Sequence, residues 1–149
     1  MLAERIESEM KEAMRAKDMV RLNTLRMLKS AVGYYLLEKG GKERPPTDAD
    51  VIAVVQKQIK QRQDSIEGYE KGGRPELAAK ERAELVVLQG YLPKQMSPEE
   101  LLALVKSTIT EVGATSKAQM GAVMKALMPK VAGKADGKLV NQLVQQNLP

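Results

Sequence analysis

The chain has 149 residues, of which 43% are hydrophobic and 29% charged, so it holds enough apolar material for a folded core. It contains no cysteine and no histidine, which excludes disulfides, zinc-finger sites, cysteine nucleophiles and histidine acid–base catalysis. A formal net charge of +5 favours polyanions as partners.

The composition also predicts the fold class. Aromatic residues make up only 3% of the chain, with no Phe and no Trp, so Leu, Val, Ile, Ala and the nine Met must fill the core. Most of these side chains, and the Glu, Lys, Gln and Arg around them, have good helix propensity, which predicts an all-α protein. Seven methionines are interpreted as core filler, with an adaptable peptide groove as the alternative. They are Met10, Met14, Met19, Met27, Met120, Met124 and Met128.

Residues 1–93 are predicted to form a domain of four helices, because apolar residues recur there at helical spacing. The first helix covers residues 2–16. Near Asp18 the phase of the apolar stripe changes, and a second helix is predicted from there to the Gly40–Gly41 doublet, which stops it. No segment alternates with the two-residue period of a strand.

Two further helices complete this domain. Thr47 and Asp50 resemble the N-cap and acidic first turn of a third helix, which ends at Gly72–Gly73. Pro75 suits the first turn of a fourth helix, and Pro93 closes it. The four helices are expected to pack together as a bundle.

A second, smaller domain of three helices is predicted in residues 97–149, after a linker at 93–96. Its start is marked by three residues in series: Ser97 as N-cap, Pro98 at the first helical position and Glu100 as the capping-box acid. About 53 residues are close to the lower size limit for independent stability.

The ends of the other two helices of this tail are predicted from residues that typically start or stop a helix. Gly113 stops the first of the three, and Ser116 is expected to cap the second. Pro129 lacks an N–H and its ring clashes inside a helix, at a cost of about 3 kcal/mol, so the second helix should end or kink near Met128. Asp136 can cap the third helix.

The strongest functional signal is the basic stretch at residues 117–140. The stretch contains five lysines and a single acid, Asp136, so the formal charge of the stretch is five minus one, or +4. Lysines without interleaved aromatics suit phosphate contact, which positions a nucleic acid without reading its bases. The predicted nucleic-acid-binding residues are Lys117, Lys125, Lys130, Lys134 and Lys138. The alternative is that these are solvated lysines beside ordinary turns.

The turn at residues 133–138 resembles a phosphate cradle, because glycines let a backbone approach an anion and helix N-termini attract one. It is not a P-loop, since the spacing and the GK[ST] ending are absent, and Asp136 at the cap position would repel a phosphate. Gly133 and Gly137 are therefore first interpreted as helix punctuation.

Two other charged sets are candidate functional sites. Basic residues on the second helix are interpreted as a solvated face, although Arg26 could pair with an acid of another helix. They are Arg15, Lys17, Arg21, Arg26 and Lys29.

The second set consists of acids that could bind a metal or act as an acid–base pair. They are Asp64, Glu67, Glu70, Glu81 and Glu84. Cations lie between these acids in the sequence, and they favour the interpretation that both form salt bridges on helix surfaces. The cations are Arg62, Lys71, Lys80 and Arg82. No catalytic residue, metal site or cofactor is predicted.

Three blocks of the sequence resemble the YqeY family, also called GatB/YqeY domain proteins. The blocks are RLNTLRMLKSAV at 21–32, RQDSIEGYEKGGRPELAAKERAELVVLQGYLPKQMSPEEL at 62–101 and GAVMKALMPKVAGKADGKLVNQLV at 121–144. The resemblance implies a cytoplasmic protein with a helical N-terminal domain followed by a three-helix tail.

The same tail module is found in the B subunit of the glutamine-dependent amidotransferase that acts on Glu-tRNA(Gln) and Asp-tRNA(Asn). There the helical and tail parts help to hold the tRNA, so the resemblance implies a non-catalytic accessory module that binds tRNA or another RNA. Carbon–nitrogen ligase activity, with glutamine as amido-N-donor, is expected only together with other subunits. The alternative is an adaptor that engages amidotransferase subunits or a tRNA synthetase. No membrane partner is expected, because no apolar run reaches the roughly 18 residues of a span.

Overall fold

A computed structural model describes residues 1–40 and 44–149. Within these ranges it contains seven α-helices, one 3₁₀ helix and no strand, so the all-α prediction is confirmed. In chain order the elements are α1 (Leu2–Ala16), α2 (Met19–Glu38), α3 (Asp48–Lys71), α4 (Pro75–Gln89), α5 (Pro98–Val112), η1 (Lys117–Gln119), α6 (Met120–Val131) and α7 (Gly137–Asn147).

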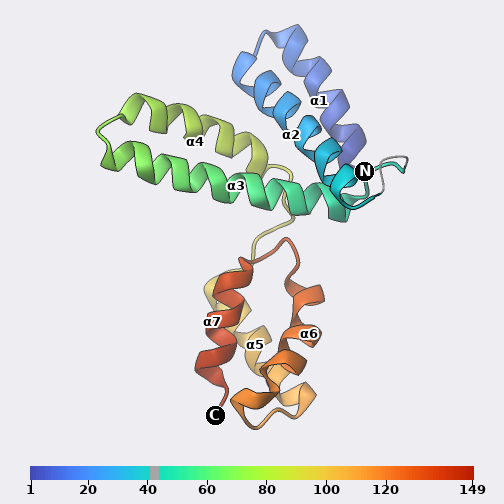
Figure 1. The fold of residues 1–149 in the computed structure, drawn as a ribbon, viewed down its shortest axis with the longest axis vertical. Helices are drawn as coiled ribbons and strands as arrows, with labels where there is room; N and C mark the ends of the chain where they lie inside the picture. Colours follow the sequence, from blue (N-terminus) through green and yellow to red (C-terminus); the bar gives the residue numbers. More distant parts are fainter. Residues whose placement is uncertain (41–43) are drawn as a thin grey trace. The chain divides into compact units, whose positions relative to one another are not determined.

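The chain divides into two compact units, Met1–Leu92 and Pro93–Pro149, which are called here the N-terminal unit and the tail unit. Helices α1 to α4 belong to the first unit and α5 to α7 to the second (Figure 1). That domains at 1–93 and 97–149 fold independently stays a prediction.

Residues at the helix ends explain where the helices stop and start. Gly40 and Gly73 have positive φ angles of 70° and 71°, the left-handed conformation that ends a helix at little cost for glycine. Gly41, the other half of the predicted stop, lies outside the described residues. Thr47 and Asp50 form a reciprocal capping box at the start of α3, as their spacing predicts. Asp18 caps α2 by accepting a hydrogen bond from the Arg21 N–H at 3.2 Å.

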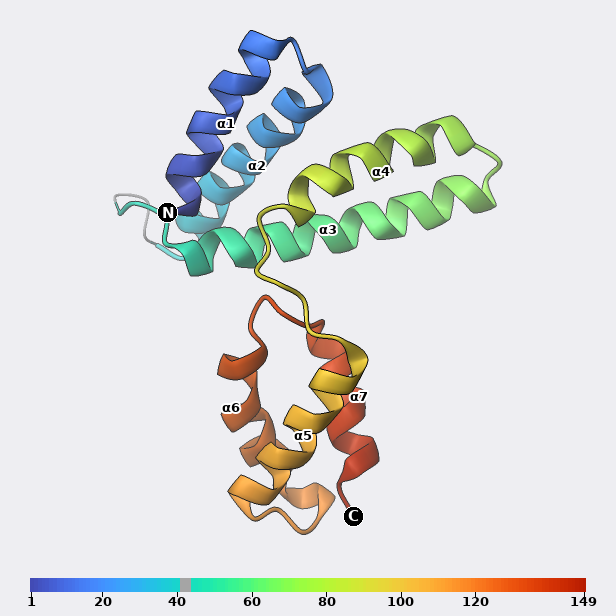
Figure 2. The ribbon, with the colours of Figure 1, turned by 180° about the vertical axis from the view of Figure 1, so that it is seen from behind.

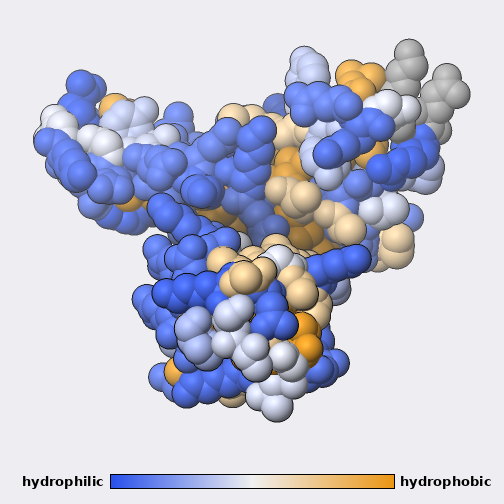
Figure 3. Space-filling view, turned by 60° about the horizontal axis from the view of Figure 1, so that its bottom comes forward, coloured by the Kyte–Doolittle hydropathy of each residue, from blue (hydrophilic) through white to orange (hydrophobic). Residues whose placement is uncertain are grey.

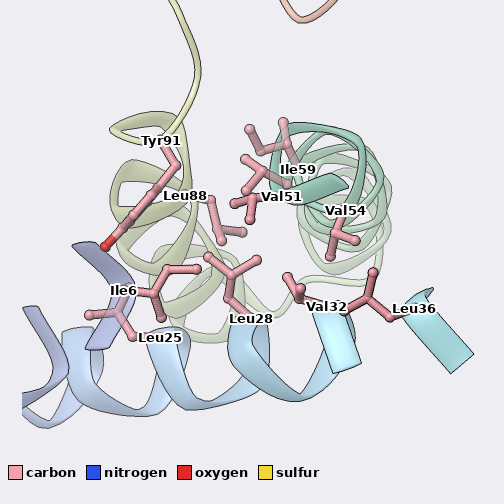
Figure 4. Packing of buried hydrophobic residues seen from close by; sticks show 11 residues of the cluster. Ile6, Leu25, Leu28, Val32, Leu36, Val51, Val54, Ile59, Leu88 and Tyr91 are labelled. Carbon is pink, nitrogen blue, oxygen red and sulfur yellow. The ribbon is translucent and has the colours of Figure 1, made fainter. Parts of the chain in front are cut away.

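The N-terminal unit consists of two helical hairpins, α1–α2 and α3–α4, whose closed ends diverge (Figures 1 and 2). Its apolar core lies where the hairpins meet and draws side chains from all four helices (Figure 4). Leu25, Leu28, Val51, Val55 and Leu88 are completely buried there. The outer part of the α3–α4 hairpin is largely hydrophilic, whereas apolar patches interrupt the surface elsewhere in this unit (Figure 3).

Charged groups hold the α3–α4 hairpin together beyond this core. Arg62 of α3 is buried, and its Nη1 donates to Glu81 Oε2 of α4 at 2.9 Å and also to Glu84. Its Nη2 lies 3.9 Å from the sulfur of Met27 on α2. Glu81 and Glu84 therefore form salt bridges, as the interleaved charges predict, but with a buried arginine rather than on a helix surface.

The tail unit packs α5, α6 and α7 around an apolar core that includes Leu101, Val105, Leu127 and Val144. The middle helix is predicted to end or kink near Met128, and α6 ends three residues later, at Val131. Pro129 lies in its last turn, so the missing N–H removes only a bond near the helix end.

The methionines divide between two environments. Met10, Met120 and Met124 pack against the two cores, as predicted. The core-filler prediction is wrong for the others, which are exposed on the surfaces of their helices. These are Met14, Met19, Met27 and Met128.

Candidate nucleic-acid interface

The basic stretch folds as η1, α6, a turn and the start of α7. Gln119 fixes its beginning, since Gln119 Oε1 accepts hydrogen bonds from the N–H groups of Thr115 at 2.6 Å and Ser116 at 3.2 Å. A single 3₁₀ turn, Lys117–Gln119, then leads into α6, whose buried face is formed by Val123, Leu127 and Val131. The apolar residues of the stretch are therefore core residues, which leaves the lysines for the surface.

The turn between α6 and α7 is a structural junction. Gly133 is buried with φ 75°, a conformation that favours glycine. The side-chain amide of Gln95 donates to the Gly133 carbonyl at 2.7 Å, and the Met96 N–H donates to the Lys134 carbonyl at 2.9 Å. The residues before α5 thereby anchor the turn.

The same turn does not supply a free phosphate cradle. Asp136 caps α7, and its carboxylate accepts the Lys138 N–H at 3.1 Å. A carboxylate in that position already interacts with the partial positive charge at the helix N-terminus and repels a second anion. The interpretation of Gly133 and Gly137 as helix punctuation is the one that these contacts support.

All five predicted lysines are exposed, but they do not form one cluster. Lys130, Lys134 and Lys138 gather at the α6–α7 turn, which contains the end of one helix and the start of the next. Lys125 lies in the middle of α6. Lys117 precedes the opposite end of that helix, whose twelve residues span about 18 Å. The lysines therefore follow α6 from end to end rather than converge on a point.

One of these lysines has an intramolecular partner. The ammonium group of Lys130 lies 2.8 Å from Glu111 Oε2 of α5, in a pair that is exposed to solvent. Exposed pairs contribute little, about 0–1 kcal/mol, so a phosphate can compete for this lysine at small cost.

Charge is segregated within the tail unit. Residues 93–112 carry Lys94 and Lys106 against Glu99, Glu100 and Glu111, which gives two minus three, or −1. Residues 113–149 carry the five predicted lysines against Asp136, which gives five minus one, or +4. The half of the unit built by α6 and α7 therefore presents the positive potential.

Sequence reasoning missed a set of exposed amides on α7. They occupy the face opposite the buried Val140 and Val144, next to Lys138. The set is Asn141, Gln142, Gln145 and Gln146. Its signal was present as amides at positions i, i+1, i+4 and i+5 of a predicted helix. Amide side chains both donate and accept hydrogen bonds, so they can bind phosphate, ribose or base edges.

Two of the five basic residues predicted to form a solvated face on the second helix instead pair with acids of α1, while Arg15 belongs to α1 and Lys17 is its C-cap. Arg21 lies 3.4 Å from Glu9, and Lys29 contacts Glu7 of α1. Arg26 is exposed, and among the described residues it has no ion-pair partner. In the α3–α4 hairpin Lys71 pairs with Glu67 at 2.8 Å, and Arg82 contacts Glu70, so the prediction of salt-bridged helix surfaces is confirmed for these residues. Among the described residues Asp64 and Lys80 form no ion pair.

These observations define a class of protein: an all-α chain with a four-helix unit and a three-helix unit, the second basic on one side. The chain belongs to the YqeY family, since the sequence model of the family described as Yqey-like protein matches residues 3–148. None of the helices in the described ranges combines the length and apolar character that a bilayer span requires.

Similar proteins occur in fungi under the name "Altered inheritance of mitochondria protein 41, mitochondrial". The protein from Pyrenophora tritici-repentis is 32% identical over 146 residues, which is 95% of this chain and 78% of that protein. The protein from Vanderwaltozyma polyspora is 31% identical over 85% of this chain and 66% of its own length. The protein from Lachancea thermotolerans is 33% identical over 72% of this chain and 57% of its own length. The chain thus spans less than two thirds of some of these relatives.

These names correct one prediction. The cytoplasmic location expected from the sequence is contradicted, because four similar proteins are named as mitochondrial. That expectation was what the resemblance to the YqeY family implied, and relatives with mitochondrial names show that similarity to this family does not fix one compartment.

Proposed function

We propose that the chain is a non-catalytic accessory protein that binds tRNA or another RNA through its tail unit. The observation that carries the proposal is the segregation of charge, with five exposed lysines and one capping acid on the α6–α7 half. Lysines spread over about 18 Å suit a ligand that carries phosphates at regular intervals, because each lysine can contact a different phosphate.

Two further features support this proposal. The amides of α7 extend the lysine surface with groups that hydrogen-bond to phosphate, sugar and bases without adding charge. The sequence of this region also resembles the tRNA-holding tail of the amidotransferase B subunit. A contribution to carbon–nitrogen ligase activity, with glutamine as amido-N-donor, would then require other subunits, because the resemblance covers the tRNA-holding part and carries over no catalytic residue.

The proposal can be tested by the salt dependence of tRNA binding. Changing Lys130, Lys134 and Lys138 together to Ala should lower affinity on the order of 10- to 100-fold at 0.1 M salt and reduce the log–log salt slope by about 2 to 3. Fluorescence anisotropy of labelled tRNA across a salt series measures both quantities, and far-UV circular dichroism checks that helix content is unchanged.

A matched variant removes three exposed lysines elsewhere, at Lys60, Lys80 and Lys106. It should keep both the wild-type affinity and the wild-type slope. An equal loss in the two variants would mean that net charge alone attracts the RNA, and an unchanged affinity in the first would remove the α6–α7 turn from the interface.

A second candidate function is a protein-interaction adaptor for amidotransferase subunits or a tRNA synthetase. The observation that favours it is an exposed apolar stripe on α2, formed by Val20, Met27 and Tyr34 at seven-residue spacing. Residues seven apart lie on one face of a helix, where a partner helix can cover them. If this candidate is right, Met27→Asp should abolish binding to the purified partner, and nuclease treatment should not.

A further inference from the structure

Exposed apolar side chains gather at the closed end of the α1–α2 hairpin. Met14 in the last turn of α1 is 56% exposed, and Met19 and Val20 at the start of α2 are 53% and 43% exposed. Single exposed apolar residues are common and need no explanation, but here three large ones occur within residues 14–20, called the hairpin tip below.

Cations accompany these side chains. Arg15 and Lys17 are exposed, and they have no ion-pair partner among the described residues. Asp18, the acid of the hairpin tip, uses its carboxylate to cap α2 by accepting the Arg21 N–H. The tip therefore offers two cations and three apolar side chains against one capping carboxylate, so its formal charge is two minus one, or +1.

The position of the hairpin tip determines which kind of binding partner it can contact. Figures 1 and 2 both show it as a free end, separate from the closed end of the α3–α4 hairpin. A free end can approach an extended flat surface. Lysine and arginine can lay their aliphatic stems along apolar material while their charged heads reach polar groups, so Arg15 and Lys17 suit a boundary between water and hydrocarbon.

We propose that the hairpin tip binds the surface of an anionic lipid bilayer. Met14, Met19 and Val20 enter the headgroup region, and Arg15 and Lys17 contact the negative charges of the lipids. RNA fits the tip less well, because phosphates would engage the two cations but leave the three apolar side chains in water. Peripheral binding of this kind needs no membrane-spanning helix.

The test uses the full-length protein, freed of RNA by nuclease, and flotation with two kinds of vesicle. Vesicles of phosphatidylcholine with phosphatidylglycerol should carry the protein, and vesicles of phosphatidylcholine alone should not. Changing Met14, Met19 and Val20 together to Ser should reduce partitioning at least about tenfold, because the apolar area that leaves water is lost. Changing Arg15 and Lys17 to Glu should reduce it similarly on anionic vesicles.

Matched variants separate the tip from other surfaces. Leu37→Ser with Val86→Ser removes two apolar side chains that are exposed elsewhere in the N-terminal unit, and it should leave partitioning unchanged. In the tail variant with Lys130, Lys134 and Lys138 changed to Ala, partitioning onto anionic vesicles should fall less than about twofold if the tip is responsible for the binding. Absence of binding to anionic vesicles would overturn the proposal and favour a protein partner at the tip. Greater loss in the tail variant than in the tip variants would also overturn it.

Discussion

The two units place their charges in opposite ways. The N-terminal unit encloses Arg62 and Asp50 and, beside its core, joins Glu9 of α1 to the buried Tyr91. In the tail unit the buried polar residue is Thr108, and the carboxylates and lysines lie outside the core. Taking a charge out of water is costly unless partners satisfy it, so the buried charges of the N-terminal unit are committed to the fold.

This difference indicates which charges are available to a ligand. The interior polar contacts of the N-terminal unit join particular elements. The ion pairs of Arg62 join α3 to α4, and the hydrogen bond from the Tyr91 hydroxyl to Glu9 joins α1 to the residues that follow α4. A ligand that recruited them would weaken the packing. The tail lysines can be recruited without such a loss, which is why the proposed RNA surface lies there.

The largest expected effect comes from breaking the interior ion pairs at Arg62. Arg62→Met leaves the carboxylates of Glu81 and Glu84 close together without their cation, and removing one partner of a buried pair costs about 3–5 kcal/mol. The free energy of unfolding of the N-terminal unit should fall by that amount. Urea denaturation followed by tyrosine fluorescence measures it, because all four tyrosines lie in this unit.

Two controls show whether the loss comes from the unpaired carboxylates. Changing Glu81 and Glu84 to Leu as well should restore most of the stability, since apolar replacement of a buried ion pair is often neutral or stabilising. Arg74→Ala breaks an exposed pair with Glu76 and should cost less than about 1 kcal/mol. If the Arg62→Met protein is as stable as the Arg74→Ala protein, the interior charges do not hold the hairpin.

A somewhat smaller effect is expected from the apolar core of the tail unit. Leu127 is completely buried, and Leu127→Ala should destabilise the tail by about 3 kcal/mol, within the range for such cavities. Far-UV circular dichroism should then show an early loss of helix, while the tyrosine transition stays where it is. A tyrosine transition that moves by the same amount would show that the units unfold together and that the predicted domains are not independent.

Much of the fold could be predicted from the sequence because its signals are local. Thr47 with Asp50, Ser97 with Glu100, and Asp136 each mark a helix start that the structure contains. Caps depend on residues a few positions apart, so no knowledge of tertiary packing is needed. Pro129 located the end of α6 only to within three residues, because a proline in the last turn of a helix removes just one hydrogen bond near its end.

The candidate sites depended on tertiary contacts, which local patterns do not contain. Composition could not distinguish Met14, which is exposed, from Met124, which packs against the tail core, because both lie at helical spacing in apolar surroundings. The tail lysines could be recognised in the sequence because they give residues 117–140 an excess of positive charge. Their spread along α6, and the pairing of Lys130 with Glu111, required the packing of α5 against α6.

The smallest effect is the response of the two units to acid. Burial would by itself raise the pKa of Glu9, but hydrogen bonds from Tyr91 and Arg5 and the charges of Arg5 and Arg21 lower it below its ordinary value of 4.5. Hydrogen bonds from Arg44 and Thr47 likewise hold the pKa of Asp50 well below its usual range. A carboxyl group whose pKa is lower in the folded state stabilises the fold above its unfolded pKa and loses that contribution as pH falls.

The N-terminal unit should therefore lose stability as pH falls below about 4.5, whereas the tail unit, whose core contains no carboxylate, should change less. Urea denaturation at pH 7 and at stepwise lower pH, followed by tyrosine fluorescence and by circular dichroism, compares the two. Glu9→Gln should be less stable than wild type at pH 7 and lose less on acidification, because it has no carboxylate to protonate. An equal acid response in this variant would mean that Glu9 does not contribute, and an equal response in both units would contradict the opposite placement of their charges.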